Sequence, residues 1–279
     1  MGALWMLVAG FMFGCMGVFV KLGAEYFSNT ELVFYRSFIG LMIMYGIVLQ
    51  RRGSIATAHW KSHLWRGISG SFALLLFFYC ITTLPLATAV TLNYTSPLFL
   101  TMLMMLVVKE RFHAPLSLAI TLGFIGIYLL LHPTFERNQI IPGLLGILSG
   151  FFAAIAMLNV RELGRHGEPE WRTVFYFSLI STVISLIFML PGTIHKPALQ
   201  NIFILVGVGS SATLAQLALT RAYSTGKTLV ASSLSYSAVV FATLFGILLW
   251  DETLSLESWA GIALITFSGI ASVRLSPRQ

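Results

Sequence analysis

Long apolar segments recur along the chain and alternate with short polar ones. Each has about the 20 mostly apolar residues that a helix needs to cross a bilayer. They run over residues 3–22, 31–50, 64–83, 86–107, 115–132, 141–161, 172–190, 201–221, 228–249 and 257–274. The segments are too long and too uniformly apolar for the strands of a membrane barrel, which alternate over about ten residues. The pattern predicts an all-α integral membrane protein with ten transmembrane helices.

The second half of the chain repeats the first with its flanking charge reversed. Residues 99–111 (FLTMLMMLVVKER) resemble residues 241–253 (FATLFGILLWDET), and Lys109 becomes Asp251. Further pairs at offsets of 140–142 are Gly10 with Gly150, Lys21 with Arg161, Tyr35 with Tyr176, Arg36 with Phe177, Ser37 with Ser178, Tyr94 with Tyr236 and Glu110 with Glu252. Five helices per copy give the second copy the opposite orientation. We expect two inverted five-helix repeats, over residues 1–137 and 138–279.

Composition and charge support this interpretation. Apolar residues make up 57% of the chain and charged residues 10%, whereas soluble domains carry about 25% charged residues. With the N-terminus in the cytoplasm, thirteen of the seventeen basic residues fall on that side: Arg51, Arg52, Lys61, Arg66, Lys109, Arg111, Arg161, Arg165, Arg172, Arg221, Lys227, Arg274 and Arg278. The positive-inside rule therefore places both termini in the cytoplasm. It also accounts for the net charge of +7, so no nucleic-acid partner is expected.

Several short motifs resemble those of a known transporter family. They are ELVFYR at residues 31–36, LPLAT at 84–88, NYTSP at 93–97, KER at 109–111, GFIG at 123–126 and the pair Asp251-Glu252. With these the chain resembles the EamA-type members of the drug/metabolite transporter superfamily. The resemblance implies a secondary transporter in the bacterial inner membrane. It implies a small organic substrate such as an amino acid, riboflavin, another vitamin, S-adenosylmethionine or a drug-like compound.

Arg36 is the charged residue that lies furthest inside a predicted span. It is about five residues, or roughly 8 Å, into its helix. Its side chain can extend to the interface or pair with an outside carboxylate such as Glu25. Alternatively, its guanidinium lies at a central cavity and holds a polar or anionic group of the substrate. Because its repeat counterpart is Phe177, such a site would be asymmetric.

Polar residues lie midway along the fourth and ninth predicted helices. Pro97 cannot donate a backbone hydrogen bond and would free the carbonyl near Asn93. Such a kink can expose groups that bind substrate, or it can be satisfied locally by Thr95 or Ser96. The ninth helix has serines and a tyrosine at the equivalent place, with Val239 instead of the proline. These small polar residues serve either substrate binding or close helix packing.

Other intramembrane residues complete the predicted site. Tyr35, Tyr79 and Tyr176 are expected to line the cavity, and Asn159 and Gln216 to find partners on other helices or on the substrate. The full set of candidate substrate-binding residues is Tyr35, Arg36, Tyr79, Asn93, Tyr94, Ser96, Asn159, Tyr176, Gln216, Ser232, Ser235 and Tyr236. Pro97, Glu110 and Glu252 are expected to serve a gate or the structure.

Other function classes lack support in the sequence. Neither Asp nor Glu lies in the middle of a predicted span, which disfavours proton coupling through a buried acid. There is no phosphate-binding P-loop, and His59 and His63 lack the glutamate of a metalloprotease helix. We therefore expect no catalytic residue, metal or cofactor, and a carrier in the lipid bilayer that works by alternating access. A non-transporting membrane subunit or a membrane enzyme is the alternative, and a homodimer is left open.

Overall fold

A computed structural model describes residues 2–84, 86–109, 114–132, 139–192, 195, 197, 199–251 and 253–275. After a short 3-10 turn, Gly2–Leu4, the helices of the first half are α1 (Trp5–Gly23), α2 (Asn29–Arg51), α3 (Trp60–Thr83), α4 (Leu86–Asn93), α5 (Ser96–Leu106) and α6 (Ala114–Leu131). Those of the second half are α7 (Ile140–Arg165), α8 (Glu170–Met189), α9 (Leu199–Thr225), α10 (Thr228–Leu234), α11 (Ser237–Trp250) and α12 (Leu256–Leu275). Each predicted span is thus one helix or two consecutive ones, and the predicted fold class is confirmed.

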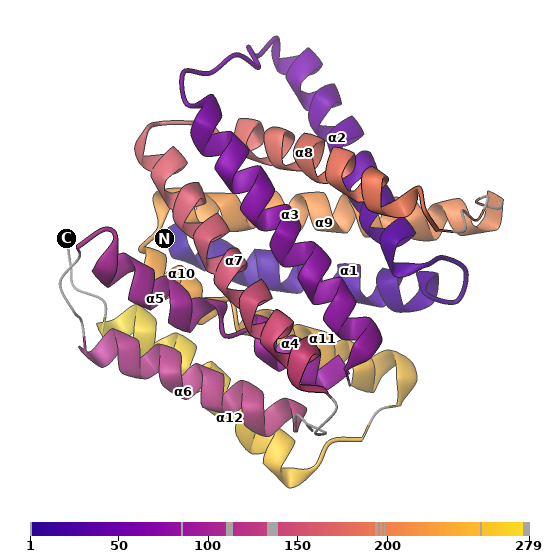
Figure 1. Cartoon of the computed structure of the whole chain (residues 1–279). Helices are drawn as coiled ribbons and strands as arrows, with labels where there is room; N and C mark the ends of the chain where they lie inside the picture. The colour runs from indigo at the N-terminus through magenta and orange to yellow at the C-terminus, as the bar shows by residue number, and fades with distance from the viewer. Residues whose placement is uncertain are drawn as a thin grey trace.

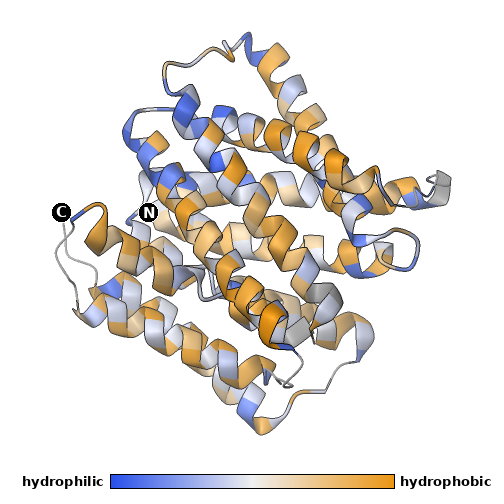
Figure 2. Ribbon diagram, in the orientation of Figure 1, coloured by the Kyte–Doolittle hydropathy of each residue, from blue (hydrophilic) through white to orange (hydrophobic). Residues whose placement is uncertain are grey.

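The helices are long and apolar enough to cross a membrane. Within the described residues, nine spans meet the length and composition that crossing requires. The one remaining predicted span, residues 64–83, corresponds to α3, whose 24 residues extend over about 36 Å. Hydrophilic residues gather at the connections and helix ends, and apolar side chains cover the outside of the helices (Figure 2). The chain is a multi-pass membrane protein.

The packing of the helices follows the repeat. The equivalent helices α2 and α8 pack on each other at one side of the bundle, and α6 and α12 pair at the other side (Figure 1). Between these pairs, α3 packs on α7 and α8 as α9 packs on α1 and α2. Likewise α7 contacts α4 and α5, as α1 contacts α10 and α11. Exchanging the two repeats therefore reproduces the contacts, as expected for two inverted copies related by a pseudo-two-fold axis.

Both repeats contain an interrupted helix at the same place. The first interruption, at residues 94–95 between α4 and α5, lies just before Pro97, as the sequence predicts. The second, at residues 235–236 between α10 and α11, has no proline. A hydroxyl bonds to a backbone carbonyl at each: Thr95 donates to the carbonyl of Leu92 (2.6 Å), and Ser235 to that of Ser232 (2.7 Å). Side-chain bonding to the backbone thus supports the second interruption, where proline is missing.

Glycines bring each interruption close to the first helix of the other repeat. A Cβ added at Gly10 of α1 would lie 2.7 Å from the hydroxyl of Ser237. One added at Gly150 of α7 would lie 3.0 Å from the carbonyl oxygen of Leu92. Since only a residue without Cβ permits this approach, Gly10 and Gly150 position the interrupted helices.

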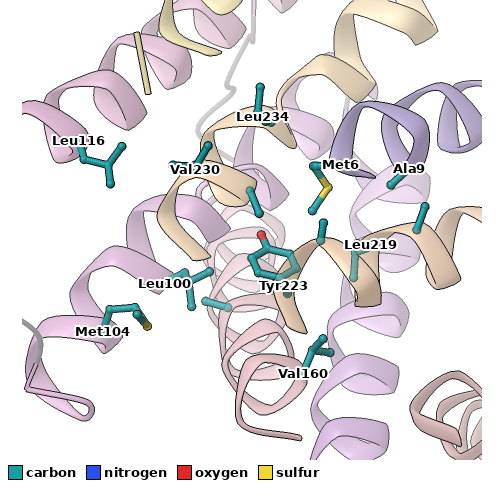
Figure 3. Packing of buried hydrophobic residues seen from close by; sticks show 14 residues of the cluster. Met6, Ala9, Leu100, Met104, Leu116, Val160, Leu219, Tyr223, Val230 and Leu234 are labelled. Carbon is teal, nitrogen blue, oxygen red and sulfur yellow. The ribbon is translucent and has the colours of Figure 1, made fainter. Parts of the chain in front are cut away.

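An apolar core joins the two repeats beside the interruptions. Met6 and Ala9 of α1 and Leu100 and Met104 of α5 belong to one buried cluster with residues of α7, α9 and α10 (Figure 3). Burial in this cluster fixes α5 and α10 against the long helices α1, α7 and α9. The interrupted helices are therefore held between the repeats.

Candidate functional site

Two buried arginines lie near one aromatic ring. Arg36 of α2 is 6% exposed and Arg66 of α3 is 2% exposed. Their guanidinium carbons lie 6.0 Å and 4.2 Å from the ring centroid of Phe177 in α8. Because Arg36 and Phe177 occupy equivalent positions in the two repeats, their meeting places this group of residues at the contact of the equivalent helices α2 and α8.

From the sequence, Arg66 counts among the basic residues of the cytoplasmic side, near the start of the predicted span 64–83, and its burial is not predicted. The structure places it in the second turn of α3, on the same buried stripe as His63, Ser69 and Ala73. Because α3 begins at Trp60, before the predicted start at residue 64, position 66 faces α8 and α9.

Two neighbouring residues fix the side chain of Arg66. Its Nη2 donates to the amide oxygen of Gln216 in α9 over 3.3 Å. A guanidinium has only donors, so the amide oxygen must face it and the amide nitrogen is left to donate elsewhere. One turn along α3, Gly70 leaves the space that the guanidinium fills, because a Cβ there would collide with Nη1 of Arg66.

The two arginines have no counter-charge among the described residues. No carboxylate of those residues forms an ion pair with either side chain. Nε of both residues and Nη1 of Arg66 are buried and lack a hydrogen-bond acceptor there. The two sequence-based alternatives for Arg36, a side chain extended to the interface and a pair with Glu25, are therefore not what the structure shows. A charged side chain at the centre of a membrane helix costs at least about 2.5 kcal/mol, so two unpaired ones require an explanation.

A small cavity lies beside these charges and, in this conformation, has a volume of about 10 Å³, room for about one water molecule. We call it the arginine cavity, and its lining residues are Arg36, Ser37, Phe177, Ser178, Ala212, Thr213 and Gln216. Its polar lining consists of a guanidinium, an amide and hydroxyls, without a carboxylate. Thr213 donates to the carbonyl of Gly209 (2.7 Å), and Ser37 shares a hydrogen bond with Ser181 (2.9 Å). Thr213 thus already uses its proton, and the groups of the lining that can donate to an anion are the guanidinium of Arg36, the amide nitrogen of Gln216 and the hydroxyl of Ser178.

The predicted residues of the interrupted helices form a second group. The rings of Tyr94 and Tyr236 lie 6.2 Å apart. Tyr236 is fully buried, and its hydroxyl finds no acceptor in the described part of the chain. Asn93 donates to the hydroxyl of Ser149 in α7 over 3.0 Å. Ser232 is fully buried.

We expected this group and Arg36 to share one central cavity. Instead, α1 and α7 lie between α3 and α9 on the arginine side and the interrupted helices on the other (Figure 1). Ser96 and the buried Pro97 begin α5, and Ser235 begins the break between α10 and α11. The structure therefore brings the predicted residues together in two places instead of one.

Four predicted cavity residues have other surroundings. Tyr79 is 45% exposed and continues an exposed stripe of α3 through Trp65 and Phe72, spaced seven residues apart. Tyr79 thus lies on an exposed face of α3, and its place in a substrate cavity stays a prediction. Asn159 donates to the carbonyl of Ile155 in its own helix (2.9 Å) instead of to another helix.

The other two are tyrosines in the second turn of α2 and of α8, at equivalent positions of the two repeats. Tyr35 packs against the ring of Phe27 at 5.9 Å, in an apolar cluster with Leu205. Tyr176 donates to the carbonyl of Ile55 (3.1 Å) and stacks on His63. Glu110 and Glu252, predicted to serve a gate or the structure, lie outside the described residues.

A carboxylate closes each end of the group formed by α2, α3, α8 and α9. Before α8, Glu168 accepts hydrogen bonds from Thr57, His63 (3.3 Å) and Arg172 (2.8 Å). Burial alone would raise the pKa of Glu168, but the hydrogen bonds from Thr57, Arg172 and His63 outweigh it and lower the pKa. At the other end of α2, Glu31 accepts from the backbone nitrogen of His195 (2.6 Å).

These two contacts tie different connections together. Glu168 joins the α7–α8 connection to the α2–α3 connection, and Glu31 joins the start of α2 to the α8–α9 connection. In the repeat, the α7–α8 connection is equivalent to the α1–α2 connection at the start of α2, and the α2–α3 connection is equivalent to the α8–α9 connection. The two contacts therefore occupy equivalent places. The arginine cavity lies between the two closures.

Comparison with known proteins agrees with this architecture. The model of the EamA-like transporter family matches residues 1–132 and again residues 141–274. An uncharacterized transporter of Helicobacter pylori (strain J99) is 32% identical over 96% of this chain and 93% of its own length. The pseudopaline exporter CntI of Pseudomonas aeruginosa (strain UCBPP-PA14) is 29% identical, over 98% of this chain and 96% of its own. The riboflavin transporter of Vibrio cholerae serotype O1 is 28% identical, over 96% and 91%.

A solved structure shares the fold. A chain described only as "Crystal structure of protein" superposes with a TM-score of 0.87 over 99% of both chains, at 19% sequence identity. The double family match agrees with the two repeats seen in the helix contacts. The chain belongs to the EamA-like transporter family, within the drug/metabolite transporter superfamily.

Proposed function

We propose that this protein is a secondary transporter that moves a small organic metabolite across the bacterial inner membrane, and that the arginine cavity binds the substrate. The observation that carries the proposal is the pair of unpaired guanidiniums buried beside a cavity between the repeats. No carboxylate of the described residues offsets the cost of removing these charges from water. A ligand that enters and leaves supplies a reason for them.

The inverted repeats supply a mechanism of alternating access. Two copies related by a pseudo-two-fold axis can exchange conformations, so that a site between them faces each side in turn. The contacts of Glu31 and Glu168 lie at opposite ends of α2, on either side of Arg36. We propose that one of them opens while the other stays closed, with both termini in the cytoplasm and the boundary between repeats at residues 137–138.

The relatives support a small-molecule substrate. One is named for export of pseudopaline and another for transport of riboflavin. In this chain, Phe177 offers an aromatic face beside the polar groups of the cavity. A substrate with both a polar and an apolar part would use both.

The proposal is tested by flux into and out of proteoliposomes across a panel of radiolabelled metabolites. We expect saturable flux of at least one compound, and its loss in Arg36→Ala protein that expresses and folds normally. Arg165→Ala is the matched control, because Arg165 is exposed at the end of α7. If the protein is folded in the proteoliposomes and no compound of the panel shows saturable flux, the transporter proposal is wrong.

A further inference from the structure

We infer that the arginine cavity selects organic anions with two carboxylates over monocarboxylates, neutral compounds and cations. The inference rests on the proposed function for the role of the cavity in transport. It starts from the charge of the empty site. Both guanidiniums stay charged at any physiological pH, and no carboxylate of the described residues pairs with either.

Since no described residue supplies the counter-charge, we assign it to the ligand. A monocarboxylate would neutralise one guanidinium and leave the other uncompensated in the bundle. A cation would add to the repulsion, and a neutral compound would not relieve it. Two carboxylates match the two charges, and a carboxylate fits the planar fork of a guanidinium with two parallel hydrogen bonds.

The position of Phe177 argues for an apolar spacer between the two carboxylates. Both guanidiniums lie beside the same ring, so their central carbons are no further apart than 10.2 Å, the sum of the distances 6.0 Å and 4.2 Å. The hydrocarbon part of a short dicarboxylate would then lie against the ring. A small inorganic dianion such as sulfate would reach the charges but leave the ring without a contact.

The remaining polar groups of the cavity also favour a ligand that accepts hydrogen bonds. Gln216 uses its amide oxygen for Arg66, so its amide nitrogen is the group left for a ligand. The hydroxyl of Ser178 also lines the cavity. Both can donate to a carboxylate oxygen that the guanidiniums leave free.

The test uses matched compounds in which carboxamides replace carboxylates. Glutarate, glutaramate and glutaramide have the same length and carry two, one and no negative charges, and phthalate, phthalamate and phthalamide add a ring. Thermal unfolding of the full-length protein in detergent is measured with each compound and with sulfate. We expect the largest increase in melting temperature with the diacids, a smaller one with the monoacids and none with the diamides.

Variants separate binding from structure. Arg36→Gln and Arg66→Gln should each remove the advantage of the diacid over the monoacid. Each should also melt at a higher temperature without ligand, because an unpaired buried charge is gone. Arg36→Lys, which keeps the charge without the fork, should retain part of the response. Arg165→Gln should behave like the wild type in both respects.

Three patterns of stabilisation would overturn the inference, and so would a lack of stabilisation by every diacid. The three patterns are equal stabilisation by diamides and diacids, stabilisation by sulfate alone, and a diacid preference that survives both Arg→Gln substitutions. Exchange of labelled diacid across proteoliposomes separates this inference from the transport proposal. Stabilisation without exchange removes transport and keeps the anion site, whereas flux of neutral metabolites that ignores both arginines keeps transport and removes the anion site.

Discussion

Gly70→Ala tests the arginine cavity without touching a residue that contacts the ligand. A Cβ at position 70 would occupy the place of Nη1 of Arg66 and would lie 3.0 Å from Cε2 of Phe177. The obstructed group is the far end of a flexible side chain, so the guanidinium moves and α3 keeps its place. Because alanine favours a helix over glycine by up to about 1 kcal/mol, we expect little change in the stability of the unliganded protein.

The expected loss is in ligand affinity. Hydrogen bonds to charged groups contribute about 1.5–3 kcal/mol, and each 1.4 kcal/mol is a factor of ten in the dissociation constant. Displacing the guanidinium of Arg66 from one carboxylate should therefore weaken diacid binding by about 10- to 100-fold. Monoacid binding through Arg36 should change much less.

The assay is a titration of the melting temperature with glutarate and glutaramate in detergent. Gly46→Ala is the matched control, since a Cβ on this glycine of α2 meets no atom within 4 Å. Unchanged diacid affinity in Gly70→Ala would refute the placement of Arg66 in the binding site. An equal loss for diacid and monoacid would refute the assignment of one carboxylate to each arginine.

Three further predictions follow from the packing, the closures and the charge. Gly10→Ala should lower the thermal stability by about 1–3 kcal/mol through overpacking against Ser237. Gly17→Ala on the same helix should not, because a Cβ there meets no atom within 4 Å. Equal melting temperatures of the two variants would contradict the close contact at Gly10. Because the pKa of Glu168 is lowered in the folded protein, its contribution to stability is present above the pKa of a free carboxyl group and is lost as the pH falls through its lowered pKa. Glu168→Gln should therefore melt lower at neutral pH and show a weaker loss on acidification, and parallel pH profiles would contradict this role. Finally, an empty cavity with two unpaired charges should reorient slowly, so unlabelled diacid on the opposite side should accelerate efflux of labelled diacid; equal rates with and without it would contradict the charge argument.

The fold could be predicted from the sequence because the bilayer imposes a length on every span. Helix α2 begins at Asn29 and ends at Arg51, against a predicted span of 31–50. The repeat and Pro97 predicted the equivalence of the halves and the first interrupted helix. The second interruption needed the structure, since no residue type marks it as proline marks the first.

The site could be predicted only in part, because apolar periodicity is weak in a membrane protein. Lipid and the interior of the bundle are both apolar, so the sequence does not show which face of α3 is inside. Neither the exposure of Tyr79 nor the burial of Arg66 could therefore be predicted from the sequence. One signal was available for Arg66: glycine at position 70, one turn away, where a helix in lipid has no need of a small residue unless something fills the space.

The asymmetry of the arginine cavity fits its symmetric scaffold. A pseudo-two-fold axis relates the packing of the repeats, so the two closures exchange when the repeats exchange conformations. A substrate has no such symmetry, and a site between equivalent helices has to break it. Arg36 and Phe177 do this at equivalent positions, one with charge and the other with an aromatic face. The duplicated helices thus provide the motion, and substitutions at single equivalent positions provide the recognition.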